Sequence, residues 1–268
     1  MAAVGSAPPG HPRQAGEDRR RARLTVLVAA AIGGIVLLGS TTQRVAGIGF
    51  GLVASPMLML LLGPLQGVVV ANVFGLGTAL VAYLGVVRQV EYRRILPIAA
   101  AAVVAIVPGA LLARSLQGPQ LSILAGCLVL VALSISVAAR RIRGLDRWPG
   151  LVTAGAAGGV MNVLAGVGGP AVTAYAIAAR WEHKAFVTSM QAYLVIVCVV
   201  SLVMRGELPA LTLPEWIVAV AALGVGAVVG AWAARRIDPR AGRIACVTVA
   251  TLGGVAVIVT GVVQLATA

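Results

Sequence analysis

The chain has 268 residues, of which 60% are hydrophobic and only 11% charged, and its formal net charge is +13. A soluble domain carries about a quarter charged residues, so this composition excludes an ordinary soluble protein and indicates an integral membrane protein. The basic residues lie in short gaps between apolar segments, and aromatic residues make up only 4% of the chain. We therefore expect contacts with the lipid bilayer and no nucleic-acid binding.

A basic tail and two similar halves follow one another along the chain. Residues 1–23 are rich in Pro, Gly and Arg and predict a disordered tail. Transmembrane repeat 1 is expected over 24–139, a basic cytoplasmic loop over 140–149 and transmembrane repeat 2 over 150–268. The tail arginines and the apolar segment after them resemble a signal peptide, but more membrane segments follow, so we expect an uncleaved first span. The five arginines of the tail favour a cytoplasmic N-terminus.

Each half begins with one overlong apolar segment, at 24–62 or 151–178, and continues with three segments of single-span length. The six single spans are predicted at 67–87, 95–115, 121–139, 185–204, 214–234 and 244–266. This pattern predicts an all-α, polytopic transmembrane helix bundle of about 8 spans. We expect a multi-pass protein of the inner (cytoplasmic) cell membrane.

A glycine-rich interruption lies inside each overlong segment. Ala46–Gly51 reads AGIGFG, and Ala165–Pro170 reads AGVGGP 119 residues later. Glycine and proline are poor helix-interior residues, and a broken helix is tolerated in a membrane only where protein or water covers the freed backbone groups. Both interruptions are therefore predicted to line an interior cavity. Two copies of one interrupted segment indicate a transporter with internal repeats and a binding site at their interface.

The arginine-rich loops are not equivalent in the two halves. In the first half, Arg88, Arg93 and Arg94 follow the second span, whereas in the second half the arginine-rich loop is the next one, at 235–243. Because basic loops face the cytoplasm, equivalent loops lie on opposite sides, as they do in inverted repeats. Inversion requires one overlong segment to cross twice or to turn back, and the sequence leaves open which one does so.

The acidic residues all lie in the tail, in loops or at span ends, which disfavours a cation as substrate. The two histidines and three cysteines form no metal-binding pattern, and no catalytic triad is recognisable, so we expect no metal, no cofactor and no enzymatic activity. The broken helices suit a small anionic substrate, because helix N-termini present free N–H groups and the positive end of the helix dipole. The alternative is that the glycines only allow tight helix packing.

The candidate substrate-binding residues are motif glycines and polar residues early in the span after each motif. They are Gly47, Gly49, Gly51, Asn72, Gly166, Gly168, Gly169, Thr188, Ser189 and Gln191. Other polar residues near the motifs include Thr41, Thr42, Gln43, Ser55, Asn162 and Thr173. Each polar side chain has interhelical hydrogen bonding as its alternative role. Arg44 is either the counter-charge for the anion or a residue that snorkels at the mouth of a hairpin.

At these residues the chain resembles the sulfite exporter TauE/SafE family of membrane transporters. The resemblance covers nearly everything from about Leu24 onward. It rests on the two glycine motifs and on the segment His183–Ser189, which is similar to the family's pattern of a basic residue, Ala and then Thr-Ser. The first half lacks the Thr-Ser pair, Phe50 stands where members tend to carry Gly, and the second motif reaches Pro170 after two adjacent glycines.

The resemblance implies transport of sulfite, an organosulfonate or another sulfur-containing oxyanion by alternating access between the two repeats. Two alternatives stay open, namely a structural or regulatory membrane subunit that transports nothing, and a carrier of another small solute. Small residues in many spans also make a helix-mediated homodimer an open alternative.

Overall fold

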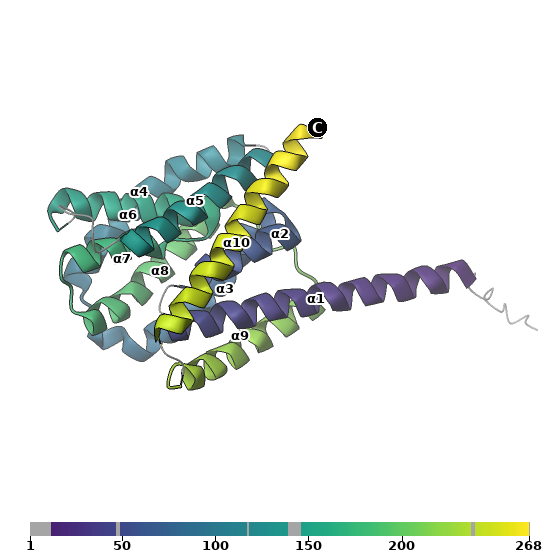
Figure 1. Ribbon diagram of the computed structural model, residues 1–268, viewed down its shortest axis with the longest axis horizontal. Coiled ribbons are helices and arrows are strands. Elements are labelled where there is room, and N and C mark those ends of the chain that lie inside the picture. The colour runs from purple at the N-terminus through teal and green to yellow at the C-terminus, as the bar shows by residue number, and fades with distance from the viewer. Residues whose placement is uncertain (1–11, 47–48, 117, 139–145, 237–238, 268) are drawn as a thin grey trace, which may run out of the picture.

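A computed structural model describes residues 12–46, 49–116, 118–138, 146–236 and 239–267, and these ranges contain helices and short connections but no strand (Figure 1). The first half contains α1 (Pro12–Ala46), α2 (Phe50–Leu62), α3 (Pro64–Val86), the short 3-10 helix η1 (Val87–Gln89), α4 (Tyr92–Ser115) and α5 (Gly118–Ala138). The second half contains α6 (Trp148–Ala165), α7 (Gly169–Ala178), α8 (His183–Arg205), α9 (Leu213–Ala233) and α10 (Pro239–Ala266).

Seven of the described helices are long and apolar enough to cross a membrane, and α2 is a shorter apolar helix. The seven spans are Arg23–Gln43, Pro64–Gln89, Tyr92–Ser115, Gly118–Ala138, His183–Arg205, Leu213–Ala233 and Ile244–Ala266. The predicted all-helical membrane bundle is thus confirmed, with seven such spans where about eight were expected. Helix α1 begins at Pro12, within the stretch that the sequence assigns to the tail.

Both overlong segments are helical hairpins that are interrupted at the glycine motifs. In the first, Gly39 near the end of α1 lies against Phe50 and Ala54 at the start of α2. In the second, Gly158 of α6 lies against Gly168 and Val172, so that α7 turns back along α6. The sequence therefore predicted the interruptions correctly, and the structure adds that neither segment is a single span.

The bundle has two ends, which we call the first and the second end. At the first end, Gln66 at the start of α3 accepts a hydrogen bond from the backbone N–H of Ala210, just before α9, at 2.9 Å. Arg114 near the end of α4 reaches the end of α8 there, donating to the carbonyl oxygen of Met204 at 2.7 Å. At the second end, the N–H of Glu91, just before α4, donates to Ser189 Oγ in the first turns of α8 at 2.9 Å.

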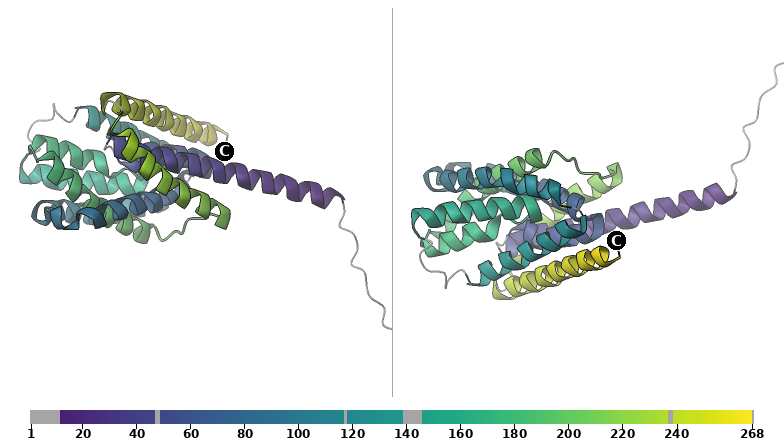
Figure 2. Two further views of the ribbon diagram at one scale, coloured as in Figure 1. Left: turned by 90° about the horizontal axis from the view of Figure 1, so that it is seen from below. Right: turned by 90° about the horizontal axis from the view of Figure 1, so that it is seen from above.

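The two hairpins enter the bundle from opposite ends. Helix α1 runs beside α9 in the same direction, because Gly33 lies against Val218 and Thr41 Oγ1 donates to the Gly226 carbonyl oxygen at 3.2 Å. Since α9 starts at the first end, α1 enters there. Figure 2 shows the C-terminal helix α10 ending toward the side from which α1 projects.

Helix α6 runs beside α4 in the same direction and so enters at the second end, where α4 starts. Its small residues let the two backbones approach closely: a Cβ added at Gly155 or Gly159 would overlap the α4 backbone at Ile98 or Ala102. This tight packing fixes α6, and with it the second glycine motif, against the core of the bundle.

Candidate functional site

A cavity of about 100 Å³ lies where the two glycine motifs meet. Its lining includes Gly49 and Gly51 from the first motif and Gly166, Gly168 and Gly169 from the second. The polar side chains in the lining are Gln43, Thr78, Asn162, Thr173 and Gln191. Among the described residues that line the cavity, none is charged.

The motifs touch through their backbones. Gly166 ends α6 in the left-handed conformation, with φ of +69°, which a residue with a side chain rarely adopts. Gly51, in the first turn of α2, lies so close that a Cβ added there would overlap the Gly166 carbonyl oxygen. One turn further along α2, Ser55 Oγ donates to the Ala165 carbonyl oxygen at 2.5 Å. Gly51 and Gly166 are therefore glycines because the two halves meet there.

The N-termini of two helices lie at this cavity. Helix α2 starts after Gly49 and helix α7 starts after Gly168, and neither capping residue offers a side chain to the free N–H groups. The first turn of each helix also lacks an acidic residue. Free N–H groups and the positive ends of two helix dipoles thus border a space whose described lining has no charged side chain, an arrangement that suits a small anion.

An amide cluster forms the side of the cavity that faces the first end. Asn162 Nδ2 donates to Asn72 Oδ1 at 2.7 Å and to Ser201 Oγ at 2.9 Å. Asn72 Nδ2 in turn donates to the Val68 carbonyl oxygen at 3.0 Å. All three polar side chains are buried. Asn72, a candidate from the sequence, therefore lies behind Asn162 and does not line the cavity.

Gln43 and Gln191 line the cavity on the side of the second end. Gln191 Nε2 donates to the Val187 carbonyl oxygen at 3.3 Å. The Oε1 atoms of both residues are buried and have no hydrogen-bond partner among the described residues. Sequence reasoning selected Gln191 but gave no special weight to Gln43 and Asn162. The missed signal was their spacing, since Asn162 follows Gln43, and Gln191 follows Asn72, by the same 119 residues that separate the motifs.

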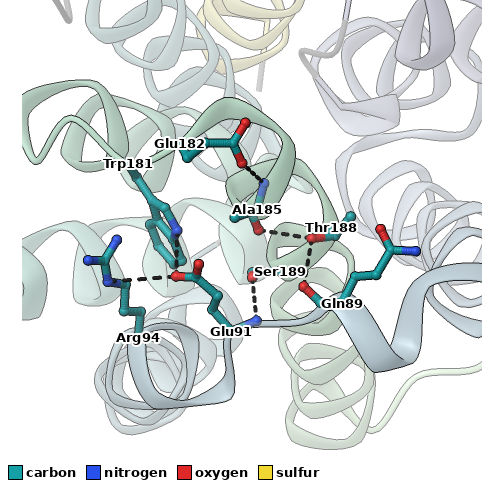
Figure 3. Close-up of polar contacts among 8 residues, drawn as sticks. All are labelled: Gln89, Glu91, Arg94, Trp181, Glu182, Ala185, Thr188 and Ser189. Carbon is teal, nitrogen blue, oxygen red and sulfur yellow. Dashed lines mark hydrogen bonds and ion pairs between the residues drawn. The ribbon is translucent and has the colours of Figure 1, made fainter.

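Thr188 and Ser189 join the two halves at the second end instead of lining the cavity. Thr188 Oγ1 donates to the Gln89 carbonyl oxygen at 3.2 Å, and Ser189 Oγ accepts from the N–H of Glu91 (Figure 3). The Glu91 carboxylate also accepts from Trp181 Nε1 at 2.9 Å. These contacts hold the α3–α4 connection against the α7–α8 connection.

Glu182 caps the N-terminus of α8 beside these contacts. Its carboxylate accepts from the N–H group of Ala185 at 2.7 Å (Figure 3). It also accepts from the N–H group of Lys184 at 3.0 Å. The hydrogen bond from Ala185, and after it the one from Lys184, lowers the pKa of the carboxyl below its usual value. The cap therefore stabilises the start of α8 at neutral pH and is lost as the pH falls through this lowered pKa.

The remaining candidates are Gly47 and Arg44. Gly47 and the Arg44 side chain lie outside the described residues. Within the described ranges, no group of three or more His, Cys, Asp or Glu side chains is placed to hold a metal ion.

Seven apolar spans and two interrupted hairpins define a multi-pass helical membrane protein. Residues 13–257 of the chain match the sulfite exporter TauE/SafE family, and the chain belongs to this family of membrane transporters. No curated protein and no solved structure matches it.

Proposed function

We propose that the protein carries a small sulfur-containing oxyanion, such as sulfite or an organosulfonate, and binds it in the cavity between the glycine motifs. The observation that carries this proposal is the pair of helix N-termini without side-chain caps, beside a lining whose described residues are uncharged. Backbone N–H groups bind oxyanions without adding a fixed charge to the empty site. On this proposal Gly49, Gly51, Gly168 and Gly169 allow the anion to approach the backbone, and Asn162 and Gln191 contact it with their amides.

We also propose that the two halves are inverted repeats that alternate access to this site. The parallel pair α1–α9 corresponds to the parallel pair α6–α4 when each helix of one half is matched with its counterpart in the other half. The two hairpins also correspond, and they enter from opposite ends. By the same matching, the amide pair Asn72–Asn162 corresponds to the pair Gln191–Gln43. The first pair is hydrogen-bonded and the second is not, so the halves differ as they do in a carrier open toward one end.

On this proposal the structure represents the state that opens toward the second end. Gln43, Thr78 and Phe186 line it there, whereas the amide cluster blocks the way toward the first end. In the opposite state we expect Asn72 and Asn162 to separate and Gln43 and Gln191 to pair. That exchange would move the accessible side of the site without moving the anion far from the helix N-termini.

We assign the second end to the cytoplasm. The connections α3–α4, α5–α6, α7–α8 and α9–α10 lie there. These connections and the helix starts beside them contain most of the basic residues, including Arg93, Arg147, Lys184 and Arg235. Short basic connections set the orientation of a membrane protein. The start of α1 then lies on the outer side, opposite to what the tail arginines alone predict.

Cysteine labelling in intact cells tests this orientation. In a variant without the native cysteines, a cysteine at Leu208 is expected to react with a membrane-impermeant maleimide, and one at Arg235 is expected to react only after lysis. The reverse result would place the second end outside. Both positions are exposed, so the comparison is matched for accessibility.

Uptake of radiolabelled sulfite into proteoliposomes, at two pH values, tests the proposed function. We expect saturable uptake in the wild type and none above empty liposomes in Gly168→Val, because a Cβ at Gly168 already lies 3.1 Å from Asn162 and a larger side chain would displace it. Gly34→Val is the control, because a Cβ there has no atom within 4 Å. Absence of wild-type uptake with sulfite and with organosulfonates would favour a non-transporting subunit. Full uptake in Gly168→Val would move the site away from the glycine motifs.

A further inference from the structure

Arg205 is a buried cation just beyond the cavity. It is the last residue of α8, where the sequence suggests an ordinary basic loop, yet only 4% of its surface is exposed. No other Lys or Arg whose side chain is described is buried. Within the described ranges, no carboxylate forms an ion pair with it. The charge of Glu207, two residues further on, acts on the guanidinium without forming an ion pair, so the burial of Arg205 requires an explanation.

The hydrogen bonds of Arg205 leave one edge of its guanidinium free. Nη1 donates to the Val163 carbonyl oxygen in the last turn of α6 at 2.6 Å. Nε and Nη2 are buried and have no partner among the described residues. These two nitrogens direct parallel N–H bonds along one edge of the guanidinium, the edge that binds two oxygens of an oxyanion side by side.

Capping of helix C-termini explains only part of this arrangement. A cation near the ends of α6 and α8 is favoured by their dipoles, and Nη1 satisfies one free carbonyl group. A long side chain at a span end would, however, ordinarily extend to water and hydrate its remaining N–H groups. Arg205 instead keeps Nε and Nη2 inside the protein, where capping gives them no partner.

Arg205 lies next to the amide cluster, between the cavity and the first end. Ser201, one turn earlier on α8, bonds to Asn162 in the amide cluster. Val163, which holds Nη1, directly follows Asn162. Arg114 of α4 holds the Arg205 backbone from the other side, donating to its carbonyl oxygen at 3.1 Å. Arg205 thus lies on the far side of the amide cluster from the cavity.

We propose that the buried, unpaired Nε–Nη2 edge of Arg205 is a second anion site, in series with the cavity and on the first-end side of the amide cluster. Its ligand is a small oxyanion with two oxygens that can accept in parallel, such as sulfite or sulfate. The serial role of this site rests on the proposed transport function, whereas anion binding at Arg205 does not. When the amide cluster opens, an anion leaving the helix N-termini meets a full positive charge before it reaches the first end.

Equilibrium binding of sulfite to the purified full-length protein in detergent tests the proposal. Isothermal titration is expected to show two sites in the wild type, and Arg205→Gln is expected to lose one of them. Arg205→Lys keeps the charge but lacks the paired N–H groups, so that site should weaken by about tenfold or more. Arg235→Gln is the control, because Arg235 is exposed at the second end and touches neither site, so both sites should remain.

The outcomes separate this inference from the proposed function. Loss of one site in Arg205→Gln and of the other in Gly168→Val supports both, and loss only in Arg205→Gln supports the second site and rejects the cavity site. Unchanged sulfite binding in both Arg205→Lys and Arg205→Gln would overturn the second site. If Arg205→Gln does not fold, Arg205→Lys decides alone, and wild-type affinity in that variant counts against the proposal.

Discussion

Replacing Gly51 with alanine is expected to lower the initial rate of sulfite uptake by about a hundredfold or more. The added Cβ would overlap the Gly166 carbonyl oxygen, and this backbone atom cannot rotate away as a flexible side chain would. The tips of the two hairpins must therefore separate and carry the helix N-termini out of position. In catalysis a misplacement of about 1 Å can cost about a hundredfold in rate, and we expect a comparable loss of uptake here.

The measurement is uptake into proteoliposomes, together with size-exclusion chromatography to show that Gly51→Ala inserts and folds. Gly34→Ala and Gly85→Ala are the controls, since a Cβ at either position has no atom within 4 Å. Wild-type rates in Gly51→Ala would show that the contact between the motifs is not needed for transport.

Replacing Asn162 with leucine is expected to reduce both stability and uptake. The change removes the donors to Asn72 Oδ1 and Ser201 Oγ and leaves these buried acceptors unpaired. An unpaired buried polar group costs about 1–3 kcal/mol. Thermal unfolding in detergent, followed by tryptophan fluorescence, measures the first effect, and uptake measures the second.

A double variant separates the structural role of Asn162 from its role in the cavity. Replacing Asn72 and Asn162 together by leucine removes both members of the pair, so stability should partly recover while uptake stays low. Ser134→Ala is the control, because Ser134 is exposed and bonds only within its own helix, to the Leu130 carbonyl oxygen. Recovery of uptake in the double variant would show that Asn162 acts only through stability.

Local features of the sequence were sufficient to predict the helical membrane fold and the two interruptions. Span length and the poor helix propensity of glycine and proline are properties of a short segment, and they do not depend on its partners. The same features placed Gly49, Gly51, Gly166, Gly168 and Gly169 at one cavity. Homodimer formation stays an open alternative.

The other parts of the site depend on partners that are distant in sequence. Thr188 and Ser189 are polar enough to bind a substrate. Their side chains are instead hydrogen-bonded to the α3–α4 connection, about a hundred residues earlier in the sequence. Arg205 has the sequence context of a loop residue, and its burial follows from α6 and α4 packing around the end of α8. Gln43 could have been selected from the sequence only by its spacing. It precedes Asn162 by 119 residues, the distance that separates the two glycine motifs.

The described residues of the cavity lining are uncharged, and this has an electrical consequence. On the proposed function, a site that holds an anion only with N–H groups and amides adds no formal charge when it is empty and takes the full negative charge of its ligand when it is loaded. The membrane voltage then changes the energy of the anion-loaded site as it moves across the membrane, but not that of the empty site. One negative charge gains about 2.3 kcal/mol per 100 mV on leaving a negative interior, equivalent to a concentration ratio of about fifty. Voltage alone would therefore favour export of the anion without a coupling ion.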